Sequence, residues 1–552
     1  MGTTSSILRE QELNEFRKLN PDEETDFELP IPPEKRKLTD KKGFVIFGIL
    51  MLILVPFMIY TLVKSDIRRI RHGIDSCGNI CGVKNSKVSG VECSGQDYTN
   101  MPYVKVNVLT NEKSCTDECP PGYIQGDNSC YGGDPFTGDV SIESVDLWVY
   151  CLNLWWKFII IALITTVLCS LTLILFRYFP GVLVWGVSIL SLIVAIALTG
   201  IFWWAVTQTR SGDPDKPGFI ALALISTIFT ISITILFIFL FRKLQLIILL
   251  YKETTKAMFA MPGIIFLPIL TLVLQLLVLA LLVTTTTFMG TSAELKEIEN
   301  SGNYFYETNG VVKFTMVFNV VVTIWALQFF AGCQYMVIAG SVGQWFFKGD
   351  PLKAPIATSF TNTMRFHLGT IAFGSFIITL VAIIKALIKS LISNARLRWL
   401  VDCCCGNIEA LLKFLSKNAY VETAIYGQSF LRSGRRAAKL LITNLGSVIA
   451  INYVGDFILA MTQFLILAIS TAIAYGIFLN ESFVVLPTVF AFILNLLIVL
   501  IVFSVFETIV DTLFICFCED TALNDGSESK PFKMTTGFKQ FMDKSQQVYE
   551  RN

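Results

Sequence analysis

Charged residues are scarce in this chain. Only 16% of its 552 residues are Asp, Glu, Lys or Arg, whereas 53% are apolar, and the mean hydropathy is +0.60. Soluble globular domains carry about 25% charged residues. This deficit excludes an ordinary soluble protein and indicates a chain that needs lipid as its solvent.

The chain also lacks a net charge of either sign, because 44 Lys and Arg residues nearly balance 43 Asp and Glu residues. No basic field is therefore available to hold a nucleic-acid backbone, and we expect no nucleic acid among the partners. Histidine is limited to His72 and His367, and HExxH, GxSxG and glycine-rich phosphate loops are missing. We expect neither an enzyme nor a bound metal or cofactor.

Long apolar runs are what the chain does have. Spanning a bilayer takes about 20 apolar residues, and runs of this length favour helices over the alternating strands of a membrane barrel. The sequence predicts an all-α polytopic membrane protein. Nine runs are long enough, and they are Gly43–Val63, Phe158–Phe176, Tyr178–Gln208, Pro217–Phe241, Ala257–Ala293, Phe314–Phe347, Leu368–Ile384, Phe457–Asn480 and Ser482–Phe506.

The first apolar run follows about forty polar residues and no small-residue cleavage site comes after it, so it is typical of a retained span. Its polar leader is expected in the cytosol. The opening residues, MGTTSS, fit the pattern for myristoylation of Gly2, with Ser6 at the preferred position. The alternative is a plain disordered tail.

A long polar insert between the first two spans carries six cysteines. A segment this small buries little apolar area, and disulfides are the usual remedy outside the cell. A zinc site is the alternative, because CGNIC and CTDEC have a three-residue gap compatible with metal ligands. With the leader cytosolic this insert lies outside, so we expect three disulfides, and fifteen connectivities remain open. The cysteines are Cys77, Cys81, Cys93, Cys115, Cys119 and Cys130.

Loop charge gives the orientation, since short cytosolic loops collect Lys and Arg. The basic segment 242–256 is expected inside, and the acidic segment 294–313 outside. Nine spans would leave the termini on opposite sides, so we expect a tenth crossing at Cys404–Phe430, with an amphipathic surface helix as the alternative. The predicted divisions are a cytosolic tail at 1–42, a first helix at 43–63, a disulfide-rich outer domain at 64–152, a transport core at 153–512 with a cytosolic or membrane-embedded segment at 396–440, and a cytosolic tail at 513–552.

Several strings resemble the choline transporter-like family, also called solute carrier family 44. They are GIDSCGNICG from Gly73, CTDECP from Cys115, MRFHLGTIAFGS from Met364, LLKFLSKNAYVETAIYGQSF from Leu411, and VDTLFICFCEDTALNDGS followed by KPFKM near the C-terminus. The resemblance implies about ten membrane helices and cytosolic termini. It also implies transport of choline, in some members ethanolamine, coupled to proton exchange, at the plasma membrane or an organellar membrane.

Choline is a quaternary ammonium without a donor on its nitrogen, so its recognition requires aromatic faces and negative charge. The sixth apolar run offers Trp325, Gln328, Phe329 and Tyr335 among small residues that permit close helix approach. Trp325 and Phe329 are four residues apart and share a helix face. We expect this group to contribute to the substrate site, and lipid-facing aromatics are the alternative.

Acidic residues within apolar runs are costly in a membrane and mark functional positions. Asp456 interrupts the apolar stretch after Leu440, and Glu507 and Asp511 lie one turn apart in the last run. These three acids are expected to compensate the charge of choline or to carry an exchanged proton. The alternative for Glu507 and Asp511 is capping of the helix end, or pairing with Arg435 or Arg436.

Two other functions compete with transport. A receptor or scaffold would use the outer domain to bind a partner, and a lipid scramblase would move lipids without accumulating choline. One glycosylation pattern begins at Asn480, in a turn so short that the bilayer disfavours modification. The partners expected from the sequence are choline or a related organic cation, membrane lipids and protons.

Overall fold

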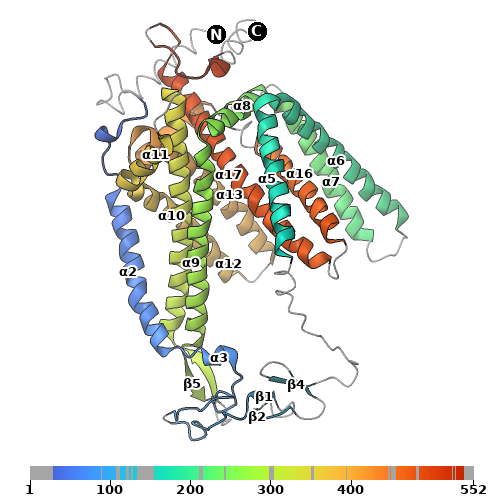
Figure 1. Cartoon of the computed structure of the whole chain (residues 1–552), viewed down its shortest axis with the longest axis vertical. Coiled ribbons are helices and arrows are strands. Elements are labelled where there is room, and N and C mark those ends of the chain that lie inside the picture. Colours follow the sequence, from blue (N-terminus) through green and yellow to red (C-terminus); the bar gives the residue numbers. More distant parts are fainter. Residues whose placement is uncertain are drawn as a thin grey trace. The chain divides into compact units, whose positions relative to one another are not determined.

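The computed structural model divides the chain into two compact units (Figure 1). Unit 1 contains 1–44, 148–272 and 329–552, and unit 2 contains 45–147 and 273–328. The structure describes residues 29–88, 90–106, 112–119, 123–125, 129–132, 154–209, 216–240, 244–297, 304–349, 354–392, 395–444, 448, 455–479, 484–524, 526–528 and 530–539. Gly2 and Asn480, which fit the myristoylation and glycosylation patterns, lie outside these residues.

Three helices cross the boundary between the units, and they are α2 (Lys41–Lys64), α9 (Phe266–Thr291) and α10 (Gly310–Lys348). The other helical elements of unit 1 are η1 (Pro33–Lys35), α5 (Trp155–Tyr178), α6 (Pro180–Gln208), α7 (Lys216–Leu240), α8 (Leu244–Ala260), η3 (Pro262–Ile265), α11 (Pro355–Asn362), η4 (Thr363–His367), α12 (Leu368–Leu391), α13 (Ala395–Tyr426), α14 (Phe430–Thr443), α16 (Asp456–Phe478) and α17 (Val485–Leu523). Unit 2 adds α3 (Arg68–Arg71), β1 (Tyr103–Val106), β2 (Lys113–Thr116), β3 (Tyr123–Gln125), β4 (Ser129–Gly132), β5 (Ala293–Glu297) and β6 (Tyr304–Thr308).

The prediction of an all-α polytopic membrane protein is confirmed. Within the described residues, eight helices are long and apolar enough to cross a bilayer, and they include α2, α5, α6, α10, α16 and α17. The fourth apolar run forms α7, whose apolar stretch is shorter, Lys216–Ser232. Each of the nine apolar runs therefore carries a helix, as their length and composition require.

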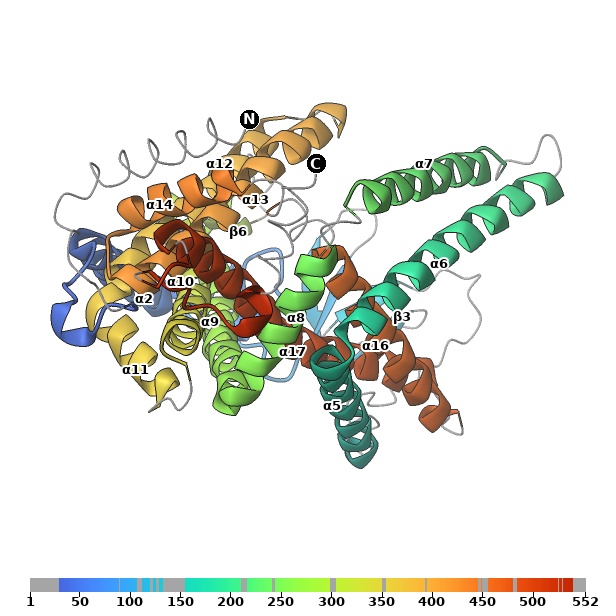
Figure 2. The ribbon, with the colours of Figure 1, turned by 90° about the horizontal axis from the view of Figure 1, so that it is seen from above.

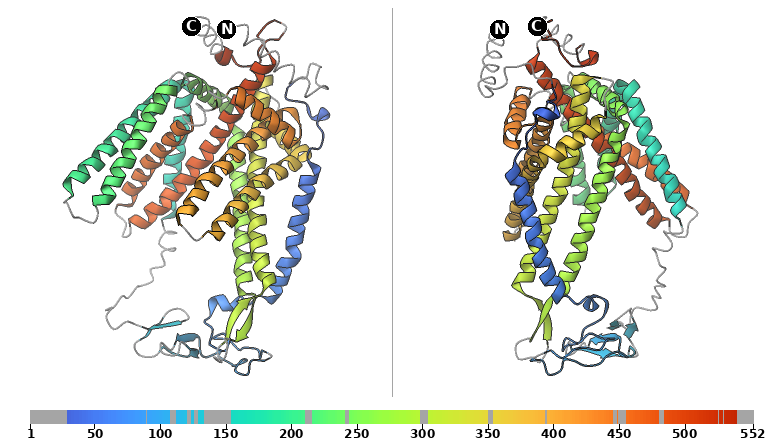
Figure 3. Two further views of the ribbon diagram at one scale, coloured as in Figure 1. Left: turned by 180° about the vertical axis from the view of Figure 1, so that it is seen from behind. Right: turned by 60° about the vertical axis from the view of Figure 1, so that its left-hand side comes forward.

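Most of the segment expected to make a tenth crossing, Cys404–Phe430, lies in α13, which ends at Tyr426, and Phe430 begins α14. Helix α13 packs along α12 and also contacts α14 and α17 (Figure 3). Its 32 residues extend about 48 Å at 1.5 Å per residue, which is long enough to cross a bilayer. If α13 crosses the bilayer, two lysines near the end of α12 lie outside, contrary to the preference of Lys and Arg for the cytosolic side. Both lysines pair with acids of α13. Lys385 lies 3.3 Å from Glu409, and Lys389 lies 2.8 Å from Asp402.

Helix α17 forms the centre of unit 1, where it packs against α16, α5, α8 and α13 (Figure 2). Its side chains are large and apolar on all faces, and Phe503 and Phe506 are fully buried. Phe506 stacks on Phe176 of α5, with 5.3 Å between the ring centroids. The helix continues without a break past the predicted boundary at 512 and ends at Leu523.

Residues 29–40 form a strap on α12, α13 and α14, and they differ from the plain tail considered for the leader. Arg36 donates hydrogen bonds to the carbonyl oxygen of Ala424 at 2.6 Å and of Ile31 at 2.9 Å. Thr39 and Arg36 each contact one ring nitrogen of His367, at 3.0 and 3.1 Å. Ala424 and His367 lie more than 300 residues away in the sequence, so composition alone could not reveal them.

His367 closes a π-helical turn, η4, between α11 and α12. This turn carries the RFHLG string, and the His367 ring is 1% exposed. A π turn inside a helix locally widens it and is often found at functional positions. Here it places both ring nitrogens of His367 against the strap, in agreement with a structural role for this residue.

The six cysteines of the outer domain form three disulfides, as predicted, and the pairs are Cys77–Cys93, Cys81–Cys115 and Cys119–Cys130. The strands lie in the order β2-β1-β4-β3, with β1 parallel to β4 and antiparallel to β2. Cys115 lies in β2 and Cys130 in β4, so the disulfides join the small sheet to the loops that flank it. Such a sheet has little apolar core of its own, and the bridges compensate for this.

The disulfide-rich domain rests on the hairpin of β5 and β6, all within unit 2. The amide of Tyr304 donates to the carbonyl of Ser76 at 2.7 Å, and the Tyr306 hydroxyl donates to the carbonyl of Gly78 at 2.7 Å. The Arg69 guanidinium lies 3.9 Å from the centre of the Tyr306 ring. Loop charge and cysteine content independently predicted the same side for these two segments, and their contact agrees with that.

Candidate functional site

The aromatic residues expected to form the substrate site do not gather in one place. Trp325 is 3% exposed and packs edge-on against Phe47, with 4.8 Å between ring centroids, both in unit 2. Phe329 is 8% exposed and packs against Phe330, and Gln328 is half-buried. Ten residues of α-helix rise about 15 Å, so Trp325 and Tyr335 cannot enclose one small ammonium group.

Tyr335 instead lies beside the acids of α17. Its hydroxyl donates a hydrogen bond to the carboxylate of Asp511 at 3.1 Å. Glu507 lies one helical turn before Asp511, on the same face of α17. Sequence reasoning named all three residues, and the structure brings them together across α10 and α17.

Asp456 is the first residue of α16 and has an exposed side chain. It interacts electrostatically with Glu507 and Asp511. Helix α14 ends at Thr443 and α16 begins at Asp456, and of the residues between them the structure describes only Asn444, Val448 and Gly455. An acid in the first turn of a helix is also favoured by the helix dipole.

Lys417 of α13 completes this group and was missed by sequence reasoning. Its ammonium lies 2.8 Å from the carboxylate of Glu507 and 5.8 Å from the centre of the Tyr335 ring. The sequence does contain a signal for Lys417, because this lysine lies inside the stretch proposed as the tenth crossing. Among charged residues, the sequence-based prediction included only acids within apolar runs. We call Tyr335, Lys417, Asp456, Glu507 and Asp511 the acid cluster, and all five belong to unit 1.

Two buried tyrosines border the acid cluster. Tyr251 of α8 donates to the carbonyl of Gly455 at 2.7 Å, next to Asp456. Burial, and after it the negative charge of Asp456, raises the pKa of Tyr251 well above its usual value, so this phenol stays a donor. Tyr420 of α13 lies on the other border, with 6.5 Å between its ring centroid and that of Tyr335.

The alternative that Glu507 and Asp511 cap the helix end is wrong. Both residues lie inside α17, which continues to Leu523, so neither caps its end. Neither pairs with Arg436, which binds Glu519 of α17 instead, with nitrogen to oxygen distances of 2.6 and 2.8 Å. Two basic residues close in sequence, Lys417 and Arg436, thus serve different carboxylates of one helix.

The C-terminal string that contributed to the family resemblance folds back on α17. Asp520 is fully buried and accepts hydrogen bonds from the amides of Lys533 at 3.0 Å and Met534 at 2.7 Å. Phe538 is also fully buried and packs against Phe517. The described residues 530–539 therefore form a packed segment beyond α17, and Cys516 and Cys518 of α17 are buried.

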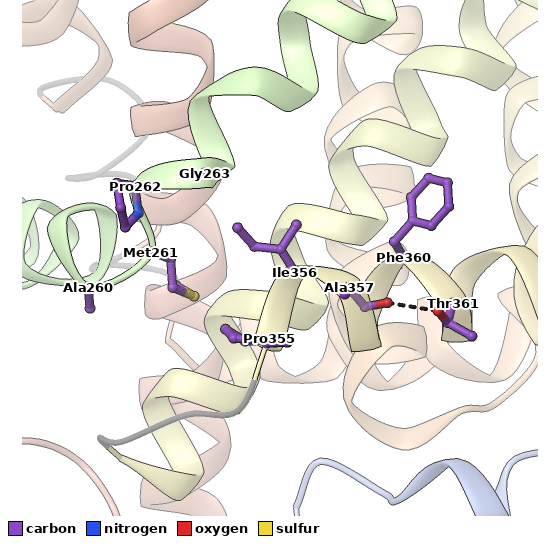
Figure 4. Close-up of a pocket in the computed structure, with 10 residues that line it drawn as sticks. Ala260, Met261, Pro262, Gly263, Pro355, Ile356, Ala357, Phe360 and Thr361 are labelled. Atoms are coloured by element: carbon purple, nitrogen blue, oxygen red, sulfur yellow. Dashed lines mark hydrogen bonds between the residues drawn. The ribbon is translucent and has the colours of Figure 1, made fainter.

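A pocket of about 510 Å³ lies elsewhere in unit 1, between the turn that follows α8 and helix α11 (Figure 4). Its lining is mostly apolar and includes Met261, Pro262, Ile356 and Phe360. No member of the acid cluster lines this pocket. Among the described residues that line it, none carries the carboxylate that a cationic substrate requires. Within the described part of the chain, no group of three or more His, Cys, Asp or Glu side chains is arranged to hold a metal ion.

Comparison with known proteins identifies the family. The family described as plasma-membrane choline transporter has a model that matches residues 224–522, more than half of the chain. The chain belongs to this family. The matched region contains every residue of the acid cluster, from Tyr335 to Asp511.

Individual choline transporter relatives align along nearly the whole chain. Choline transporter-like protein 1 of Xenopus laevis is 29% identical, with 94% of each chain covered. Choline transporter-like protein 1 of Rattus norvegicus is 28% identical over 94% of this chain and 93% of its own. Choline transporter-like protein 3 of Homo sapiens is 26% identical over the same shares. The similarity therefore includes the disulfide-rich domain as well as the helices.

Proposed function

We propose that this protein carries choline across a membrane and binds the ammonium group of choline at the acid cluster. The observation that supports this most directly is the contact between Tyr335 and Asp511, with a cation already held beside the Tyr335 ring. Membership in the choline transporter family supports the same substrate. The contact and the family membership together support transport of choline by this chain.

The chemistry of the acid cluster suits a quaternary ammonium. Such a group offers no hydrogen-bond donor, so it is attracted by aromatic faces and by carboxylates at short range. Tyr335 supplies a ring, and Asp511, Glu507 and Asp456 supply negative charge. The side chains of Lys417 and Glu507 are each 42% exposed, whereas the Tyr335 ring beside them is buried.

We extend this proposal to ethanolamine as a second substrate and to protons as the exchanged ion. The primary ammonium of ethanolamine has three N–H donors, and the three carboxylates can accept hydrogen bonds from them. The same acids therefore bind ethanolamine in our proposal. The acid cluster contains three carboxyl groups and one ammonium group. Protonation of a carboxyl group as the substrate leaves would limit the uncompensated charge, which is costly within a membrane. Proton exchange therefore accompanies transport in our proposal.

We further propose ten crossings with both termini in the cytosol and the disulfide-rich domain outside, at the plasma membrane. Helix α13 provides the tenth crossing, because its charged residues pair with those of α12 and its last turns pack against α14 and α17. Accessibility of single cysteines introduced at Lys37 and Asn85 to an impermeant thiol reagent tests this. Labelling at Lys37 from outside intact cells would refute it.

The transport proposal is tested by uptake of labelled choline into proteoliposomes that contain the purified protein. Asp511→Asn keeps the shape of the side chain and removes its charge, and we expect uptake to fall about tenfold or more. The matched control is Asp402→Asn, which removes an exposed carboxylate of α13 paired with Lys389 and should leave uptake unchanged.

Wild-type protein that is folded but takes up no choline would refute the proposal. Lipid flipping without choline accumulation would indicate a scramblase, and binding of an outer partner without either would indicate a receptor. Tyr335→Phe, which keeps the ring, should retain more uptake than Tyr335→Ala, because the ring face is what attracts the ammonium.

A further inference from the structure

Lys417 is the one cation that the structure describes within the acid cluster. Its ammonium lies 2.8 Å from a carboxylate oxygen of Glu507 and 5.8 Å from the centre of the Tyr335 ring. It also interacts electrostatically with Asp511 and Asp456. An ammonium group beside an aromatic ring and several carboxylates is the arrangement that an organic cation would adopt in a binding site.

The ion pair of Lys417 and Glu507 differs from a structural ion pair in its exposure. Both side chains are 42% exposed, whereas Arg436 and Glu519 are 5% and 0% exposed. A partly exposed pair contributes less to stability than a fully buried one, so exchange of its partner costs less. A buried pair resists such exchange, because a charge left unpaired inside the protein is expensive.

Charge balance explains why replacement of Lys417 by the substrate cation would aid transport. Without a cation, three carboxylates face one another across α16 and α17, and repulsion with desolvation opposes any motion that encloses them. With Lys417 present, the empty site keeps one positive charge beside Tyr335 and Glu507. Substrate brings a second positive charge of the same kind to the same groups.

We propose that Lys417 is a tethered substitute for the substrate cation. It occupies the ammonium position between Tyr335 and Glu507 when the site is empty, and it moves away when an organic ammonium enters. The site thus keeps one positive charge at the ammonium position in both conditions, which lets the empty protein change conformation and return for another substrate. This inference rests on the proposed function, since it assumes that the acid cluster binds the transported cation.

The inference makes two measurable demands. Because Lys417 competes with the substrate, Lys417→Gln should bind choline more tightly, by about fivefold if an exposed pair of about 1 kcal/mol is lost. Because the empty site then lacks its cation, net uptake should fall about tenfold or more while exchange of internal for external choline continues. Exchange never requires the empty site to change conformation.

The experiment uses the full-length protein in detergent for choline binding and in proteoliposomes for net uptake and exchange. Lys413→Gln is the matched control, because Lys413 lies one turn earlier on α13 and pairs with Glu409 at 2.7 Å. It should leave binding, uptake and exchange unchanged. Glu507→Gln should weaken choline binding, so removal of the two partners of one ion pair should have opposite effects.

The results separate this inference from the proposed function. If the wild type takes up no choline, the proposed function fails. If the wild type transports but Lys417→Gln binds choline no more tightly, or loses net uptake and exchange equally, Lys417 is not a substitute cation. Should Lys417→Gln not fold, Lys417→Arg decides, since a stronger carboxylate partner should weaken choline binding severalfold, and unchanged binding would overturn the inference.

Discussion

Loss of the buried guanidinium of Arg436 should destabilise this protein more than loss of its carboxylate partner. Arg436 lies on α14 and contacts Glu519 of α17 through two nitrogen to oxygen contacts, at 2.6 and 2.8 Å. Glu422 of α13 lies 3.4 Å from the same guanidinium, and its side chain is 0% exposed, as is that of Glu519. One cation therefore serves two buried carboxyl groups.

The charge of Arg436 is firmly held. Burial by itself lowers the pKa of its guanidinium, but Glu519 outweighs burial and the resulting pKa lies above the ordinary value for arginine. Tyr426 adds to this group, because its hydroxyl donates to Glu519 at 2.9 Å and accepts from Arg436 at 2.5 Å. The whole group joins three helices, α13, α14 and α17.

The loss of unfolding free energy in each variant depends on which charge is left without a partner. Arg436→Met leaves two buried carboxyl groups without their cation, and breaking such a pair costs about 3–5 kcal/mol. Glu519→Gln leaves Arg436 with Glu422 and with the new amide, so we expect about 1–3 kcal/mol, as for a lost charged hydrogen bond. The loss of unfolding free energy in the double variant should be smaller than the sum of the losses in the two single variants, by about 2 kcal/mol.

The assay is the free energy of unfolding in mixed micelles, measured for wild type, both single variants and the double variant. Arg435→Met is the matched control, because this neighbouring arginine is exposed and its loss should cost less than about 0.5 kcal/mol. Additive costs in the double variant, or a larger cost for Glu519→Gln than for Arg436→Met, would refute the reasoning.

Three further predictions concern the segments around the helices. Arg36→Ala should release the strap, because three contacts are lost, and raise amide exchange at 29–40 by about tenfold or more, whereas the exposed Lys37→Ala should not. Cys119→Ser should cost the outer domain about 2–4 kcal/mol, measured as earlier cleavage by protease during denaturation, and an unchanged midpoint would contradict it. Asp520→Ala should free the C-terminal segment from α17, since two backbone amides lose their acceptor. Limited proteolysis near Lys530 would detect this, and equal resistance to the wild type would count against it.

Local chemistry made much of this protein predictable. An apolar run long enough to cross a bilayer must close its own backbone hydrogen bonds, so each such run became a helix. Six cysteines in a short outer insert similarly predicted disulfides. The pairing remained open, because three bridges can be drawn in fifteen ways and only the sheet brings Cys115 near Cys81 and Cys130 near Cys119.

The candidate site was predictable only in part. Glu507 and Asp511 could be found because an acid within a membrane span is rare and costly. Tyr335 was found among several aromatic residues of one helix, and nothing in the sequence separated it from Trp325. The tertiary structure makes that choice, because the Tyr335 hydroxyl donates a hydrogen bond to Asp511.

The sequence by itself determined that the chain is a helical membrane protein with a disulfide-rich domain, since these properties depend on composition, run length and cysteine content. Tertiary structure alone decided the partners of its charges. Lys417 binds Glu507, Arg436 binds Glu519, and Arg36 contacts His367. Each pair joins residues 83 to 331 positions apart, and a pairing over such distances depends on how whole helices pack, which local sequence does not encode.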